Sequence, residues 1–144
     1  MVEKDTVRLL RECDAGVKMG ISSIDDVLDN VRGESMKRSL KTCKTAHEKL
    51  EKEIRCALDR FQDDGKAPDP LAKGMSWMKT NMRLAVNESD ATVADLMTDG
   101  CNMGVKSLSK YLNQYKAADE DSKRIARELI KLEADLATEL RSCL

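Results

Sequence analysis

The sequence has few aromatic residues, prolines and histidines. Its 144 residues include one Trp, two Tyr, one Phe, two Pro and one His. The shortage of aromatic residues, together with the lack of alternating apolar and polar runs, argues against a β-rich domain. A single histidine and the lack of a Gly-rich phosphate loop leave no recognisable catalytic constellation. We therefore expect an all-α protein without enzymatic activity.

Long apolar runs and an excess of one charge are also missing. No apolar stretch approaches the roughly 18 residues of a membrane span, and the polar opening from Met1 to Asp5 is not a signal sequence. Lys and Arg number 25 against 26 Asp and Glu, which gives no reason to expect nucleic acid or a membrane as partner. The five cysteines form no C-x-x-C pair and fit reduced thiols. We expect a cytoplasmic protein.

A nine-residue pattern occurs twice. The segment from Gly16 to Ile24 reads Gly-x-x-Met-Gly-aliphatic-x-Ser-aliphatic, and the segment from Gly100 to Leu108 repeats it 84 positions later (100 − 16). The apolar residues around both segments recur at three- and four-residue steps, the period of one helix face. We predict a duplicated pair of amphipathic helices.

Four glycines lie inside these predicted helices at matched positions, Gly16 with Gly100 and Gly20 with Gly104. A glycine in a helix costs about 1 kcal/mol relative to alanine, so their presence calls for a reason. A G-x-x-x-G face allows two helices to approach closely, and we expect the two repeat helices to pack through it. The alternative is a remnant of the duplication without a packing role.

Residues 1–144 are predicted to form one helical-bundle domain of two hairpins, at about 5–62 and 89–144, joined by a crossover at 63–88. The first helix should begin after an N-cap at Asp5 and end at Gly33, which suits a left-handed C-terminal position. The second should run from near Ser35 to near Gln62. Its stripe is Met36, Leu40, Cys43, His47, Leu50, Ile54, Ala57 and Phe61.

The second hairpin is predicted with one alternative. A helix at about 90–115 follows the cap Ser89, although one bent helix over 75–115 also fits. The last helix should begin after Asp119 or Asp121 and continue to the C-terminus. A Met-rich stripe at 71–86 is expected to fill core space.

The connection between the hairpins determines the topology. Two prolines and a glycine at 63–70 forbid a helix there. Fully extended, residues 63–74 span roughly 40 Å, close to the length of the predicted helices. A crossover along the bundle is therefore favoured over an all-antiparallel arrangement, which would need only a short turn.

The second helices of the two hairpins share one polar interruption. Aligning Lys37 with Lys123 gives a displacement of 86 (123 − 37), at which His47 falls opposite Glu133. Each residue interrupts an otherwise apolar stripe. We expect both side chains to project into the middle of the bundle.

With its two helical hairpins, its Pro/Gly crossover and the segment Trp77-Met78-Lys79 before a break, the chain resembles ferritin-like four-helix bundles. It is more closely similar to an uncharacterised bacterial branch of them. Metal-binding members of that fold hold a di-metal centre with a Glu from each first helix and a Glu-x-x-His motif from each second helix.

The sequence departs from that ligand pattern. Lys44 precedes the histidine by three residues where the motif has Glu, and Leu136 follows the glutamate by three residues where the motif has His. Asp14 could reach the core, but its counterpart in the repeat is Thr98. The resemblance therefore implies a degenerate site.

His47, Glu133 and Asp14 remain as candidate metal ligands, for Fe, Mn or Zn. Cys43 could complete such a site, because Cys-x-x-x-His can share a zinc ion on one helix face. We expect instead that His47 and Glu133 form a hydrogen-bonded core pair without a cofactor.

The sequence thus predicts a non-catalytic, ferritin-like bundle that has lost its di-metal site and assembles as a homo-oligomer or binds another protein. The alternative is a metal-binding protein with a reduced site that carries out redox or metal-handling chemistry. Thiol-based sensing would require Cys56 or Cys143 to be exposed and to have a lowered pKa.

Overall fold

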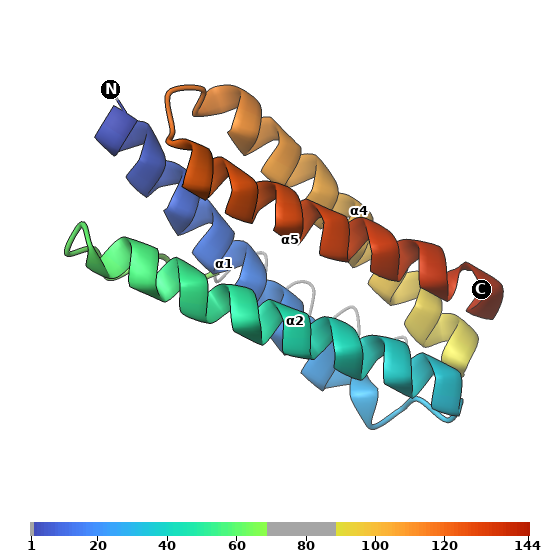
Figure 1. Cartoon of the computed structure of the whole chain (residues 1–144). Helices are drawn as coiled ribbons and strands as arrows, with labels where there is room; N and C mark the ends of the chain where they lie inside the picture. The colour runs from blue at the N-terminus through green and yellow to red at the C-terminus, as the bar shows by residue number, and fades with distance from the viewer. Residues whose placement is uncertain (1, 69–88) are drawn as a thin grey trace.

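The computed structural model describes residues 2–68 and 89–144, which form four long helices (Figure 1). These are α1 (Val2–Leu28), α2 (Glu34–Asp59), α4 (Asp90–Gln114) and α5 (Glu120–Glu139), and a short 3₁₀ helix, η1 (Leu140–Cys143), follows α5. The described ranges contain no strand, so the all-α prediction is confirmed. No helix in these ranges is long and apolar enough to cross a bilayer.

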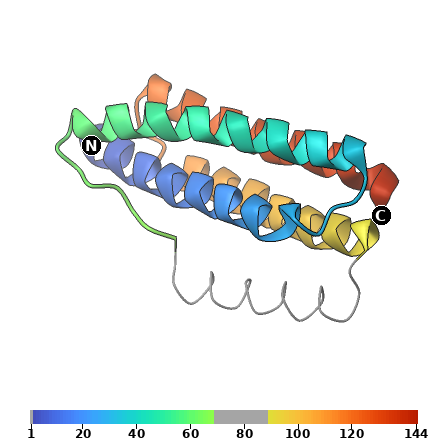
Figure 2. The same cartoon turned by 90° about the horizontal axis from the view of Figure 1, so that it is seen from below.

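The helices pack as two hairpins. α1 lies against α2 and α4 against α5, and the hairpins meet through the pairs α1–α4, α1–α5 and α2–α5. Figure 2 shows that α2 ends at one end of the bundle and α4 begins at the other. The end of α2 and the start of α4 thus lie at opposite ends of the bundle, and most of the predicted crossover between them lies outside the described residues. The Met-rich stripe at 71–86 lies outside the described residues.

The boundaries of α1 differ from the sequence prediction. The helix begins at Val2 rather than after Asp5, and it ends at Leu28 rather than at Gly33. Gly33 has φ −70° and ψ 127°, so it is the extended N-cap residue of α2 and not a left-handed C-terminal residue. The chain turns over residues 29–33, where burial of Val31 holds the connection against the core.

The predicted caps of the second hairpin are correct. The Ser89 side chain accepts a hydrogen bond from Thr92 N, and the Asp119 side chain accepts one from Ser122 N. Ser89 itself is extended, with φ −115° and ψ 155°, so the alternative of one bent helix over 75–115 is wrong. In the first hairpin, α2 stops at Asp59, three residues before the predicted end.

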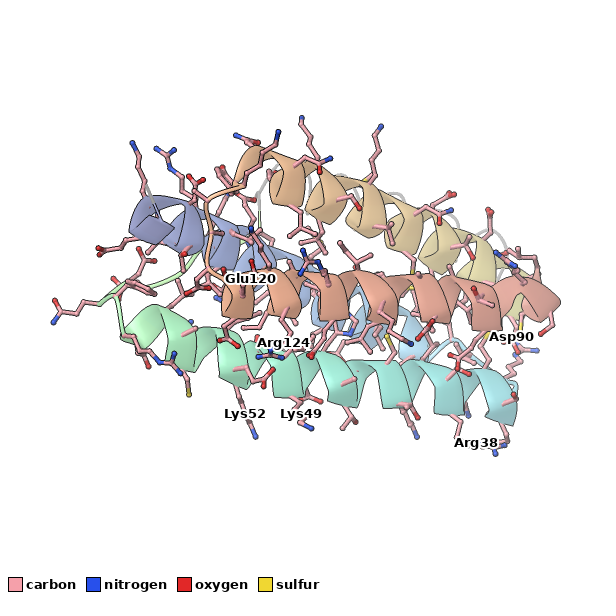
Figure 3. The ribbon with its side chains drawn as sticks, turned by 45° about the horizontal axis from the view of Figure 1, so that its top comes forward. Arg38, Lys49, Lys52, Asp90, Glu120 and Arg124 are labelled. Atoms are coloured by element: carbon pink, nitrogen blue, oxygen red, sulfur yellow. The ribbon has the colours of Figure 1, made fainter. Side chains whose placement is uncertain are left out.

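Each hairpin turn is held by the first residues of the other hairpin. Asp90, at the start of α4, accepts hydrogen bonds of 2.8 Å from the backbone amides of Arg32 and Gly33 (Figure 3). At the other end of the bundle, Asp5 and Thr6 of α1 accept backbone hydrogen bonds of 3.0 and 2.8 Å from the α4–α5 turn. These contacts fix the two hairpins relative to each other at both ends.

The core consists of two apolar clusters that follow one another along the bundle. The first contains Leu9, Leu10, Cys13, Val17, Leu50, Ile54, Ala57, Leu58, Leu108, Ala118, Ile125, Ala126 and Leu129. The second contains Ile24, Val27, Val31, Met36, Leu40, Cys43, Val93, Ala94, Met97, Cys101, Leu136 and Leu140. The stripe predicted for α2 is buried, apart from Phe61, which is partly buried against the first cluster.

Candidate functional site

The structure brings His47 and Glu133 together where the two apolar clusters meet. On α2, the stripe residue before His47 is Cys43, which belongs to one cluster, and the next one is Leu50, which belongs to the other. His47 Nε2 lies 3.1 Å from Glu133 Oε1, and the two side chains are 1% and 12% exposed. The pair forms a polar layer between two apolar blocks.

The hydrogen bonds of His47 determine where its protons are. Nδ1 lies 2.8 Å from the backbone oxygen of Cys43. Because a carbonyl oxygen can only accept, Nδ1 carries a proton. The contact between Nε2 and Glu133 needs a second proton between its two atoms. With that proton on the ring, both nitrogens donate and an imidazolium faces a carboxylate.

The surroundings favour the charged ring. Burial opposes it, but the hydrogen bonds of His47 with Cys43 and Glu133 and the negative charge of Glu133 outweigh burial and raise the pKa of His47 to about 10. The pair is thus an imidazolium and a carboxylate, with two protons on the ring and no net charge at neutral pH. Each partner satisfies a group that would otherwise be buried without compensation.

Two of the repeated glycines make room for this pair. A Cβ at Gly20 of α1 would lie 2.7 Å from His47 Cδ2 and Nε2 and 3.4 Å from Glu133 Oε1. A Cβ at Gly104 of α4 would lie 3.4 Å from Glu133 Cδ. At the level of the polar layer, the four helices therefore contribute His47, Glu133 and two glycines.

The other two glycines have looser surroundings. A Cβ at Gly16 would meet Leu129 at 3.6 Å and Leu108 at 3.9 Å, and one at Gly100 would meet no atom of residues 2–68 or 89–144 within 4 Å. The expected close approach of α1 and α4 is therefore not seen at Gly100. Side chains, mainly from α2 and α5, occupy the space beside Gly16, Gly20 and Gly104.

A groove lies between α1 and α4 above the polar layer. Its volume is about 280 Å³, and its lining includes all four repeated glycines, His47 and Glu133. Apolar side chains form most of its remaining wall, among them Met19, Met97 and Leu108. The groove gives the exposed edge of Glu133 a route to the surface.

Two cysteines border the pair. The Cys43 thiol lies 3.5 Å from His47 Nδ1. Burial raises the pKa of the Cys101 thiol far above its usual range, and the charge of Glu133 and a hydrogen bond with Glu133 add to this effect. Cys101 is therefore a protonated thiol, which is a poor nucleophile. Cys56 is exposed on α2 and Cys143 is partly buried.

Asp14 is separate from the pair. Its buried carboxylate accepts hydrogen bonds of 2.8 Å from Lys18 Nζ and 2.9 Å from the backbone amide of Lys66. Gly65, with φ 86°, lies so close that a Cβ there would overlap Asp14 Oδ2. Asp14 thus holds the start of the crossover against α1. No group of three or more His, Cys, Asp or Glu side chains within 2–68 and 89–144 is placed to hold a metal ion.

Lys44 does not face the polar layer. Its ammonium forms an ion pair of 2.6 Å with Asp25 of α1, which joins the two helices of the first hairpin. The hydrogen bond with Asp25 raises the pKa of Lys44. The sequence offered no local signal for this pair or for the contact of Asp14 with the crossover, because the partners lie on different elements.

Comparison of the chain with protein-family models, with curated proteins and with solved structures finds no match. The resemblance to ferritin-like bundles remains a prediction from the sequence.

Proposed function

We propose that this chain is a non-catalytic, ferritin-like helical bundle that binds a protein partner and uses His47 and Glu133 as a structural pair. One observation supports this proposal above the others: each polar atom of the His47 ring already has a partner in the protein, Nδ1 in the Cys43 carbonyl and Nε2 in Glu133. A ring that donates from both nitrogens has no lone pair for a metal ion or for general base catalysis.

The composition of the polar layer supports the same proposal. A di-metal centre in a four-helix bundle needs carboxylate ligands from all four helices. Here α1 and α4 contribute Gly20 and Gly104 at this level, and Asp14 is engaged with Lys18 and the crossover. The residues present therefore do not fit a di-metal centre.

Metal retention tests this proposal. Untagged protein would be incubated with excess Fe(II), Mn(II) or Zn(II), freed of unbound metal and analysed for its metal content, with His47→Ala treated in parallel. We expect the same trace content in both proteins. About one equivalent in the parent that is lost in His47→Ala would refute the structural role of the pair.

A second candidate function, metal binding at a reduced site, is favoured by the orientation of the histidine. Metal-bound histidines commonly donate their other ring N–H to a backbone carbonyl, as Nδ1 does here towards Cys43. If Nε2 lost its proton, Nε2 and the Glu133 carboxylate would be two adjacent metal ligands in the lining of the groove. The metal analysis above separates this function from the first.

A further inference from the structure

The outward face of α2 carries a row of cations that form no ion pair within the described part of the chain. Arg38, Lys41, Lys49 and Lys52 are all exposed. None of the four forms an ion pair with a residue in the described ranges 2–68 and 89–144. Figure 3 shows Arg38, Lys49 and Lys52 projecting from α2 away from the rest of the bundle. We call these four residues the basic stripe.

The geometry of the stripe is narrow and regular. At about 100° per residue, its four positions fall within a sector of about 80°, and at 1.5 Å per residue they extend over about 21 Å. The remaining positions of that sector between Arg38 and Cys56 are Thr45 and Cys56 itself. No carboxylate interrupts the stripe along this length.

The corresponding helix of the other hairpin shows that such a face is not a necessity of the fold. On α5, Arg124 pairs with Asp121 at 2.9 Å and with Glu128 at 2.8 Å, and Lys131 pairs with Asp135 at 2.7 Å. Helix α5 therefore pairs two of its three exposed cations with carboxylates one turn away, whereas the third, Arg127, forms no ion pair with a described residue. Helix α2 pairs Lys37 and Lys44 with carboxylates, but the four cations of the basic stripe form no ion pair with a described residue.

We propose that the basic stripe docks an acidic α-helix of a protein partner, an inference that rests on the proposed partner-binding function. A helix of about four turns with carboxylates along one face has the length and width of the stripe. Each exposed ion pair contributes little alone, so recognition comes from several pairs acting together and weakens as salt is added.

The carboxylates around the stripe favour a helix over a broader anionic surface. Glu34 and Asp59 lie beyond its two ends, and Glu48 and Glu53 lie along its sides. A nucleic acid duplex or an anionic bilayer would extend past the stripe and meet these carboxylates. The whole chain, with a formal charge of −1, offers such surfaces no wider attraction.

The test uses a fluorescein-labelled, alanine-based helical peptide of about four turns with Glu along one face, and a control peptide with Gln in place of each Glu. Fluorescence anisotropy measures their binding at low salt to the parent protein and to two variants. Lys49→Glu/Lys52→Glu reverses two charges of the stripe. Arg127→Glu/Lys131→Glu reverses two exposed charges on α5 and changes the net charge equally.

We expect the parent to bind the Glu peptide and not the Gln peptide. Binding should weaken about tenfold in the stripe variant, the equivalent of losing two favourable pairs, and by less than about twofold in the α5 variant. If circular dichroism shows that the Glu variant has lost helix, Lys49→Gln/Lys52→Gln takes its place, because it adds no negative charge. This variant should also bind the Glu peptide more weakly than the parent does.

Three results would overturn the proposal. They are equal affinity of the parent for both peptides, equal weakening in the two charge-reversal variants, and tighter binding to a DNA duplex or to phosphatidylserine vesicles than to the Glu peptide. None of them would alter the assignment of His47 and Glu133, which the metal analysis tests separately.

Discussion

The two hairpins place different residues at matching positions of the polar layer. Gly20 and Gly104 are 84 positions apart (104 − 20), and His47 and Glu133 are 86 apart (133 − 47). In the first hairpin, a Cβ at the glycine would overlap the imidazole at 2.7 Å, whereas in the second it would lie 3.4 Å from the carboxyl carbon. A helical glycine thus makes room for a tightly enclosed imidazole in the first hairpin and for a less confined carboxylate in the second.

A similar contrast exists at the hairpin turns. The Asp90 carboxylate accepts two hydrogen bonds from the first turn. The second turn donates one hydrogen bond to the Asp5 carboxylate and one to the hydroxyl of Thr6, which lies 84 positions before Asp90 (90 − 6). Hydrogen bonds to a charged acceptor are stronger than neutral ones. The comparison therefore predicts that matched substitutions in the two hairpins have unequal effects.

The largest effect should come from separating the central pair. Glu133→Leu leaves the charged and buried His47 without its carboxylate, and we expect a loss of about 3 kcal/mol in the free energy of unfolding, measured with urea. The double variant His47→Leu/Glu133→Leu should recover most of this loss, because an apolar pair leaves no buried charge. A double variant no more stable than Glu133→Leu would show that an uncompensated charge on His47 is not what destabilises Glu133→Leu.

Raising the pH should remove the contribution of the pair gradually. The pKa of His47 is raised from 6.5 to about 10 in the folded protein. The stabilisation is therefore complete below about pH 6.5 and is lost as the pH rises towards 10. Urea unfolding between pH 6 and pH 10 should show falling stability in the parent and a flatter profile in His47→Leu/Glu133→Leu. A parent whose stability rises over this interval would contradict the assignment.

The turn contacts should give a smaller difference. Asp90→Ala removes the acceptor of two backbone hydrogen bonds and should cost about 2 kcal/mol. Thr6→Val removes one neutral acceptor and should cost about 1 kcal/mol. Thermal and urea unfolding of the two variants would measure both values. Equal losses would contradict the predicted difference between the Asp90 carboxylate and the Thr6 hydroxyl as acceptors.

The smallest effects should come from substituting the glycines with alanine, and the effects at Gly20 and Gly100 should have opposite signs. Gly20→Ala places a methyl group against the enclosed His47 ring and should destabilise the protein by about 1 kcal/mol, since overpacking exceeds the gain in helix propensity. At exposed Gly100 an added Cβ meets no atom of the described residues within 4 Å, so Gly100→Ala should stabilise by up to about 1 kcal/mol. Two variants with the same melting temperature would contradict this account of the glycines.

The sequence was informative where the controlling interactions are local. The apolar period of α2 predicted its buried face, and the caps Ser89 and Asp119 predicted where two helices begin. The sequence was misleading where contacts with residues far along the chain determine the role of a side chain. Asp5 has the chemistry of a helix cap, yet it binds the turn between α4 and α5 instead.

The candidate site shows the same division. Interrupted stripes on α2 and α5 identified His47 and Glu133, since helix periodicity alone places them on the buried face. The function of the glycines could not be predicted in this way, because it depends on which helix faces Gly20 and how far away it lies. Asp14 lies on the same helix as Gly20, but one of its two oxygens, Oδ2, accepts a hydrogen bond from the backbone amide of Lys66 at the start of the crossover.

Because His47 is the only histidine of the chain, its protonation can be observed directly by ¹⁵N–¹H nuclear magnetic resonance. The central claim is that the ring donates hydrogen bonds from both nitrogens. At pH 8 we expect Nδ1 and Nε2 both to be protonated, with the ring in its imidazolium form. A neutral ring at pH 8, with a proton on Nδ1 and a lone pair on Nε2, would contradict the claim and favour a metal-binding site.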